Sequence, residues 1–146
     1  MINEKVMDWM SRTVLTINAD QTLPEAHALM KEYNVRRLPV LEQGRLVGIV
    51  TLGDLREASP SDATSLSIFE LNYLLARLTM QDIMTRDPLT VAPNTRLAEA
   101  AKLMLHHKVG GLPVMEGGSL VGIITETDIF RAYVHLAEEP ASEVAA

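Results

Sequence analysis

The sequence predicts an α/β (α+β) fold made from two copies of one unit of about 50 residues. Residues 6–56, moved forward by 74 positions without a gap, match residues 80–130 at 22 of 51 positions. Within each copy, short β-branched and aliphatic runs alternate with segments of helical periodicity, as in mixed α/β units. We expect the two copies to pack with pseudo-twofold symmetry, so that a site in one has a counterpart in the other.

The composition indicates a soluble globular protein with an aliphatic core. Of the 146 residues, 47% are hydrophobic and 4% aromatic, and no cysteine is present. The lack of cysteine excludes disulfides and thiolate chemistry. A formal net charge of −6 disfavours nucleic acid, whose phosphates attract clustered Lys and Arg. The apolar runs are much shorter than a membrane span and the first ten residues carry charges, so we expect a cytoplasmic protein that does not enter a membrane.

The predicted domain organisation follows the duplication. Residues 1–56 form the first repeat, and residues 79–137 form the second. Residues 57–78 between them are expected to form a polar loop and a helix, and residues 138–146 a flexible tail. Each half is too small to bury a convincing core alone, so we expect the repeats to fold together as one module.

The first repeat is expected to contain a small three-stranded sheet with flanking helices. A helix should start at Thr22, because this N-cap residue is followed by Pro24 in the first turn and Glu25 at the capping-box position. Apolar residues at helical spacing predict its buried face, namely Ala26, Leu29, Met30 and Tyr33. The expected strands are residues 14–17, 38–41 and 46–51, with a turn at Gly44 and a second helix from Leu52.

The second repeat has the same order of elements. Strands are expected at residues 89–91, 112–115 and 120–125, and helices at about 95–107 and 126–137. Between the repeats, Ser67 and Glu70 form another capping box, which predicts a helix over residues 67–78. This helix is an insertion into the minimal repeat, so we expect its leucine side to lie in an interface. The leucines of that side are Leu71, Leu74, Leu75 and Leu78.

A Thr-x-x-Asp motif ends the last strand of each repeat. The first copy is Thr51 and Asp54, and the second is Thr125 and Asp128. In one interpretation, Thr is an N-cap and Asp completes a capping box, which only starts a helix. In the other, the Thr hydroxyl donates to a phosphate and the carboxylate accepts both hydroxyl hydrogens of a ribose. The two interpretations are compatible, because both use the same strand-to-helix junction.

Both repeats have a Met-Ser or Met-Thr opening, a Leu-Pro-Val strand and a Gly-Ile-Val/Ile-Thr-x-x-Asp ending. On these motifs, the chain from Val6 to Arg131 resembles the tandem CBS-domain family, also called the Bateman module. It implies a regulatory module that senses AMP, ADP, ATP or an adenosyl compound such as S-adenosylmethionine in clefts between two CBS repeats. The segment between the repeats is similar to that of stand-alone prokaryotic, acetoin-utilisation-like members without an ACT domain.

By position, the resemblance implies two composite ligand sites. One would combine Thr51 and Asp54 with Leu89, Val109, Gly110 and Gly111, and the other Thr125 and Asp128 with Leu15, Val35, Arg36 and Arg37. The two sites should be unequal, because a guanidinium can bind a further phosphate, whereas a glycine offers only backbone donors. The alternative for the two arginines is a solvated entry to a strand.

No catalytic or metal-binding arrangement stands out. His106 and His107 are neighbours on a predicted helix without a further ligand at i+4, and neither a GxSxG motif nor a Walker-type loop is present. We therefore expect no enzymatic activity, no metal and no required cofactor. The expected partners are the adenosyl ligand, a second copy of the chain in a homodimer, and an unidentified regulated protein. The alternative is a constitutive scaffold module with empty clefts, in which the Thr-x-x-Asp motifs act only as caps.

Overall fold

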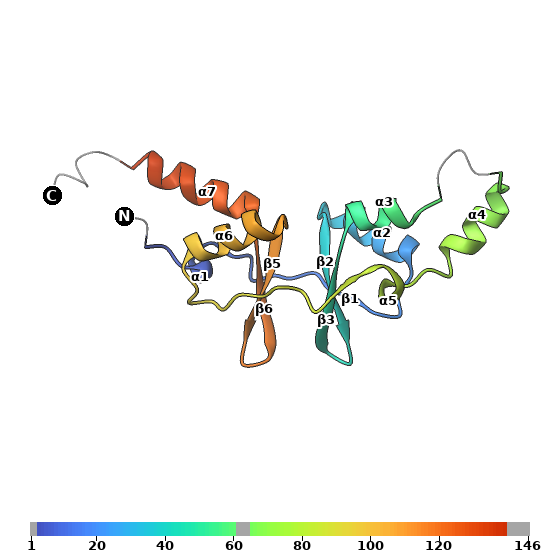
Figure 1. Ribbon diagram of the computed structural model, residues 1–146, viewed down its shortest axis with the longest axis horizontal. Coiled ribbons are helices and arrows are strands. Elements are labelled where there is room, and N and C mark those ends of the chain that lie inside the picture. Colours follow the sequence, from blue (N-terminus) through green and yellow to red (C-terminus); the bar gives the residue numbers. More distant parts are fainter. Residues whose placement is uncertain (1–2, 61–64, 140–146) are drawn as a thin grey trace. The chain divides into compact units, whose positions relative to one another are not determined.

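The computed structural model describes residues 3–60 and 65–139, which divide into two compact units (Figure 1). The first-repeat unit consists of residues 15–88. The second-repeat unit combines the chain up to residue 14 with the chain from residue 89 onward. The opening segment of each sequence repeat therefore lies in the unit of the other repeat. Part of the expected inter-repeat loop, residues 61–64, and the tail from residue 140 lie outside the described residues.

The first-repeat unit contains a four-stranded sheet in the order β1-β2-β3-β4. Strand β1 (Ile17–Asn18) is parallel to β2 (Arg37–Glu42), and β3 (Arg45–Thr51) and β4 (Thr85–Arg86) continue the sheet in antiparallel pairings. Its helices are α2 (Leu23–Tyr33), α3 (Leu52–Ala58), α4 (Ile68–Leu75) and α5 (Met80–Ile83). The three expected strands are present, and β4, from the opening of the second repeat, adds a fourth.

The second-repeat unit is built around the antiparallel hairpin of β5 (Gly111–Glu116) and β6 (Ser119–Thr125). Its helices are α1 (Val6–Trp9), α6 (Leu97–His107) and α7 (Glu126–Ala137). Single bridges join Val91 to Val114 and Ser11 to Ile123. These bridges correspond, 74 residues apart, to the pairs Ile17–Val40 and Ile49–Thr85 of the other unit. The prediction of an α/β fold with two copies of one unit is confirmed.

A glycine in each hairpin lets the opening segment of the other repeat approach closely. A Cβ atom on Gly122 would lie 2.7 Å from Met10 Sδ and 2.9 Å from the backbone oxygen of Ser11. A Cβ on Gly48 would meet Met84 in the same way and would lie 2.9 Å from the backbone oxygen of Thr85. A larger residue at either glycine would overlap the opening segment, so the close approach of this segment to the hairpin depends on the glycine.

The predicted helix starts are confirmed at two of the capping boxes. At α2, Glu25 N donates to Thr22 Oγ1 (3.4 Å) and Thr22 N donates to Glu25 Oε1 (3.2 Å). Ser67 and Glu70 exchange the same pair of bonds at α4. Helix α6 starts at Leu97, later than expected, because the hydroxyl of Thr95 accepts a hydrogen bond from Ala92 N and closes a turn instead of capping the helix.

Each unit has its own aliphatic core, and each core includes residues from the opening of the other repeat. Met80 and Met84 belong to the core of the first-repeat unit, and Val6 and Met10 to that of the second-repeat unit. The buried face predicted for α2 is right at Ala26 and Met30 and wrong at Tyr33, which is 56% exposed. Tyr33 is the last residue of α2, where the left-handed Asn34 (φ 53°) ends the helix, so its side chain points to solvent.

Helix α4 is shorter than predicted and divides its apolar residues between two environments. It ends at Leu75, and both Leu75 and Leu78 pack against the core of the first-repeat unit. Ile68, Phe69 and Tyr73 are exposed. The expected interface role of this helix stays a prediction.

Candidate functional site

The first Thr-x-x-Asp junction forms a complete capping box. Strand β3 ends at Thr51, whose backbone N donates to Asp54 Oδ2 (2.8 Å), and Asp54 N donates to Thr51 Oγ1 (3.1 Å). The next amide, Leu52 N, donates to the carbonyl of Arg36 (2.8 Å). Asp54 Oδ1 accepts no hydrogen bond from the residues that the structure describes, and the side chain is half-buried. One carboxylate oxygen therefore starts the helix, and the other is available to a ligand.

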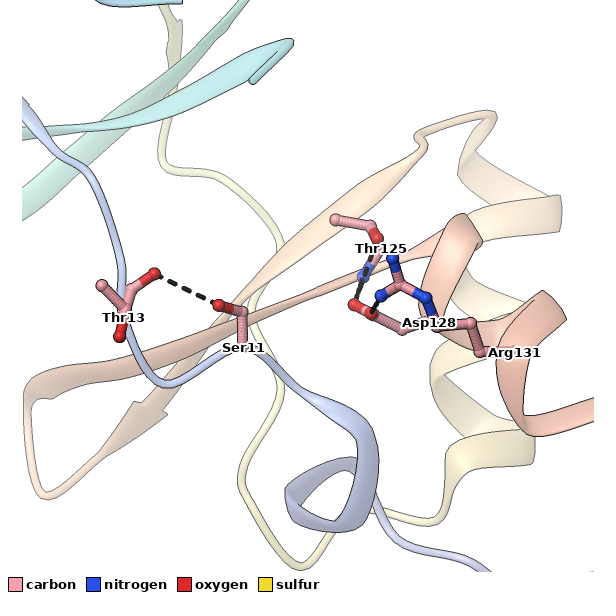
Figure 2. A network of polar contacts seen from close by, with 5 residues as sticks. All are labelled: Ser11, Thr13, Thr125, Asp128 and Arg131. Carbon is pink, nitrogen blue, oxygen red and sulfur yellow. Dashed lines mark hydrogen bonds and ion pairs between the residues drawn. The ribbon is translucent and has the colours of Figure 1, made fainter. Parts of the chain in front are cut away.

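The second junction has the same backbone geometry but uses both carboxylate oxygens (Figure 2). Thr125 N and Thr125 Oγ1 both donate to Asp128 Oδ2, at 2.9 and 3.1 Å. Arg131, one turn further along α7, donates to Asp128 Oδ1 at 3.1 Å. Asp128 is 6% exposed, whereas the side chain of Arg131 is 68% exposed. A ligand that binds Asp128 Oδ1 would have to displace this arginine and take its place beside a nearly buried carboxylate.

The opening segment of the first repeat runs close to this second junction. Ser11 forms a bridge with Ile123 of β6, two residues before Thr125. Its hydroxyl donates to the carbonyl of Thr13 (3.2 Å), which fixes the turn of the chain as it leaves the strand edge. Figure 2 shows Ser11 and Thr13 on the opening segment, and Thr125, Asp128 and Arg131 together where β6 meets α7.

A pocket of 280 Å³ lies at the first junction and is lined by three arginines, one more than predicted for any site. It is lined by Arg36, Arg37, Thr51, Leu52, Gly53 and Arg56. Arg36 and Arg37, which the resemblance groups with Thr125 and Asp128, line this pocket beside Thr51 of their own unit. Arg56 was not predicted. Helical spacing could have found it, because Arg56 is four residues after Leu52 and three after Gly53, on the same face of α3.

The apolar residues predicted for the sites are accessible to different degrees. Leu15 and Val35 of the first-repeat unit are half-buried against its core. Leu89 and Val109 of the second-repeat unit are 39% and 37% exposed. Gly110 is half-buried and its carbonyl accepts from Glu126 N (3.0 Å), while Gly111 is buried at the start of β5. The composite pairing of these residues with the Thr and Asp of the other repeat stays a prediction.

A second hollow, of 510 Å³, lies between α2, α3 and α4 of the first-repeat unit. It is lined by Leu23, Pro24, His27, Leu52, Leu55, Arg56, Ser59, Asn72 and Leu75. Sequence reasoning did not find this groove, because it depends on how α4 packs. Leu52 and Arg56 line both hollows.

Two further features concern chemistry and membranes. Among the described residues, no group of three or more His, Asp or Glu side chains is placed to hold a metal ion. Over the same part of the chain, no helix has the length and apolar character needed to cross a membrane.

Comparison with protein families identifies the class to which this fold and these junctions belong. The model of the CBS domain matches residues 6–61 and 80–135, which together make up most of the chain. The chain belongs to the CBS domain family, with two tandem domains, and the predicted resemblance is confirmed.

Curated relatives include both stand-alone proteins and larger enzymes. A CBS domain-containing protein of Dictyostelium discoideum is 35% identical over 135 residues, which is 91% of this chain and 93% of the relative. The inosine-5'-monophosphate dehydrogenase of Korarchaeum cryptofilum (strain OPF8) is 36% identical over 125 residues. That match spans 85% of this chain but only 23% of the dehydrogenase.

Solved structures with the same fold include complexes with adenosyl ligands. The CBS domain pair of protein MJ0100, in complex with 5'-methylthioadenosine and S-adenosyl-L-methionine, has a TM-score of 0.75 at 26% identity and covers 90% of this chain and 97% of its own. CBSX2 in complex with AMP has a TM-score of 0.77 at 30% identity, covering 92% and 99%. A Vibrio cholerae protein assigned to acetoin utilization has a TM-score of 0.76 at 33% identity, covering 94% and 95%.

Proposed function

We propose that this chain is a cytoplasmic regulatory module that binds AMP, ADP, ATP or S-adenosylmethionine through its two Thr-x-x-Asp junctions and carries out no chemistry itself. The observation that carries the proposal is the junction at Thr51 and Asp54. There the carboxylate has one oxygen in the capping box and a second oxygen available, beside a pocket lined by arginines. The adenosyl complexes of MJ0100 and CBSX2 support this choice of ligand.

The chemistry of the junction suits a ribose phosphate. The free oxygen of Asp54 can accept hydrogen bonds from the vicinal hydroxyls of a ribose. The guanidiniums of Arg36, Arg37 and Arg56 can then bind phosphate oxygens with charge-assisted hydrogen bonds. At Asp128 the same role requires Arg131 to release Oδ1, so we expect the second site to be weaker for the same ligand.

The adenine ring would lie against accessible apolar side chains. We propose Leu89, Val109 and the backbone of Gly110 and Gly111 for the ligand at Asp54, and Leu15 and Val35 for the ligand at Asp128. Leu89 and Val109 are each more than a third exposed, so a flat aromatic ring would remove apolar surface from water on both sides of the contact. A ligand that contacts both repeats would favour one arrangement of the chain over others and so regulate a partner.

Isothermal titration calorimetry of the intact chain tests the proposal. The protein is titrated with AMP, ADP, ATP and S-adenosylmethionine at fixed salt, together with the variants Asp54→Asn and Asp128→Asn. Asparagine keeps the capping bond through its carbonyl oxygen but presents an amide NH₂ to the ribose. Loss of a charged hydrogen bond costs about 1.5–3 kcal/mol, so each variant should weaken one site by about 10- to 150-fold.

Folding controls separate a lost site from a lost structure. Each variant should keep the wild-type circular dichroism spectrum and the fluorescence of Trp9, the single tryptophan. If the folded wild type binds none of the four ligands at millimolar concentration, the adenosyl proposal is wrong. It is also wrong if both Asp variants bind all ligands as the wild type does.

The capping geometry favours one alternative function, a constitutive scaffold. The hydroxyl of Thr51 and Oδ2 of Asp54 already accept the two hydrogen bonds of the capping box, and both carboxylate oxygens of Asp128 accept hydrogen bonds. In this case the motifs only start α3 and α7, and ligand binding is absent. The same titration decides, because a scaffold shows neither binding heat nor stabilisation by any ligand.

We also propose that two copies of the chain form a homodimer through α7. Phe130, Tyr133 and Val134 lie at i, i+3 and i+4 on one side of this helix and are 65%, 68% and 50% exposed. Sedimentation equilibrium should give a dimer for the wild type and a monomer for Phe130→Asp. Leu105→Asp on α6, where the side chain is 81% exposed, is the matched control and should remain dimeric. A regulated protein partner would then respond to the ligand-bound dimer.

A further inference from the structure

Arginines from three separate positions converge on the pocket at the first junction. Arg36 precedes β2, Arg37 is its first residue and Arg56 lies on α3. All three line the 280 Å³ pocket together with Thr51. Arg36 and Arg56 are exposed and Arg37 is half-buried, so all three line a hollow at the surface of the unit and not its core.

The equivalent positions of the second repeat carry no cation. Moved by 74 residues, Arg36, Arg37 and Arg56 correspond to Gly110, Gly111 and Phe130. In addition, Leu52, which lines the first pocket, corresponds to the exposed Glu126. Arg131 brings a cation to the second junction, but its guanidinium is paired with Asp128 at 3.1 Å. Two junctions with the same backbone and the same Thr-Asp pair therefore differ sharply in charge.

We propose that the two adenosyl sites select ligands by charge: the first-repeat junction takes a nucleotide with two or more phosphates, and the second-repeat junction takes an adenosyl ligand without a polyphosphate chain. This inference rests on the proposed function and adds ligand class to it. Guanidinium groups bind phosphate oxygens bidentately, so several of them reward each additional phosphate. Glu126 opposes a polyphosphate by like-charge repulsion and tolerates a neutral or cationic ligand.

The test compares ligands that share adenosine and differ in charge. Calorimetry uses ADP, AMP and the uncharged 5'-methylthioadenosine, with Asp54→Asn and Asp128→Asn to assign each binding event. At the first-repeat site, ADP should bind at least ten times more tightly than AMP. At the second-repeat site, 5'-methylthioadenosine should bind at least as tightly as ADP. Increasing salt should weaken ADP binding and leave 5'-methylthioadenosine binding nearly unchanged.

One substitution with a matched control ties the preference to the pocket. Arg56→Gln should remove most of the tenfold preference for ADP over AMP and leave the binding of 5'-methylthioadenosine unchanged. Arg45→Gln is the control, since Arg45 is exposed at the opposite end of β3 from Thr51 and should leave the ratio as in the wild type. Inorganic pyrophosphate should compete with ADP in the wild type and fail to do so in Arg56→Gln.

The outcomes separate this inference from the proposed function. If AMP and 5'-methylthioadenosine bind but ADP binds no more tightly than AMP, the adenosyl function stands and selection by charge is wrong. An unchanged ADP preference in Arg56→Gln also overturns it. If no adenosyl compound binds, both proposals fail. Pyrophosphate binding in that case would identify the pocket as an anion site without a nucleoside.

Discussion

Replacing Gly122 by alanine tests how tightly the opening segment is held in the second-repeat unit. The added Cβ would lie 2.7 Å from Met10 Sδ and 2.9 Å from the backbone oxygen of Ser11. The sulfur is at the end of a flexible but buried side chain, whereas the oxygen belongs to a bridge. Ser11 N donates to Ile123 O at 2.9 Å, and Ile123 N donates to Ser11 O at 3.0 Å.

Two responses are available, and their free energies decide between them. Keeping the segment in place and absorbing the overlap costs about 1–3 kcal/mol, as for other overpacked sites. Releasing the segment loses two hydrogen bonds at about 0.5–1.5 kcal/mol each. It also exposes Val6 and Met10, which are 0% and 9% exposed, at about 1.5–3 kcal/mol each. The release therefore costs about 4–9 kcal/mol, so we expect Gly122→Ala to keep the segment bound and to lose about 1–3 kcal/mol of unfolding free energy.

Urea denaturation followed by the fluorescence of Trp9 measures this loss directly. Trp9 packs against the core of the second-repeat unit, and its ring centroid is 5.6 Å from that of His135. Gly53→Ala is the control, because its Cβ would meet Thr51 Oγ1 at an ordinary 3.6 Å, and we expect no destabilisation. Wild-type stability in Gly122→Ala would refute the reasoning. A solvent-exposed Trp9 spectrum without urea would show instead that release costs less than strain.

Three further predictions concern the core, the second site and pH. Met80→Ala removes a fully buried side chain that the second repeat contributes to the first-repeat unit. In urea denaturation it should lower the unfolding free energy of that unit by about 2–5 kcal/mol, and a loss below about 1 kcal/mol would contradict its core role. Arg131→Ala frees Asp128 Oδ1 and should strengthen adenosyl binding at the second junction in calorimetry. It should also lower the unfolding free energy, because the nearly buried carboxylate loses its ion partner, and weaker binding would mean that Arg131 contacts the ligand. Hydrogen bonds from the side chain of Gln21, and then from Thr22, hold the pKa of Glu25 below its ordinary 4.5. The cap therefore stabilises the fold fully above pH 4.5, and this stabilisation is lost as the pH falls through the folded-state pKa. The stability advantage of the wild type over Glu25→Leu, measured by denaturation at pH 7 and at successively lower pH, should shrink on acidification, and a constant difference would exclude the linkage.

Local signals explain why most elements could be predicted from the sequence. The helix at Thr22 is marked by residues within one turn, and the hairpin that ends at Thr51 by a short apolar run. Tyr33 was assigned to the buried face because periodicity alone does not say where a helix leaves its sheet. Helix α6 starts late because Thr95 satisfies a turn, and a Thr looks the same in both roles before the fold is known.

Features that depend on distant pairing were not predictable in the same way. Strand β4 has two residues and pairs with a strand some 35 residues earlier, so no periodicity marks it. The available signal was Gly48, a glycine inside a strand, which often indicates close approach of another backbone. At the site, the positions of the Thr and Asp residues followed from the repeat. The role of Arg56 becomes visible only when the start of β2 and the face of α3 are considered together.

The arrangement of the two units along the chain sets an order of synthesis. The first-repeat unit is one continuous stretch, residues 15–88, and it interrupts the second-repeat unit, whose parts lie before and after it. During translation the inner unit has all its residues once residue 88 has emerged, and domains generally fold as they become complete. Val6 and Met10 cannot be buried in the core of the second-repeat unit until β6 has been made some 110 residues later. In this chain, residues made before the first-repeat unit reach their native contacts only after that unit has been made.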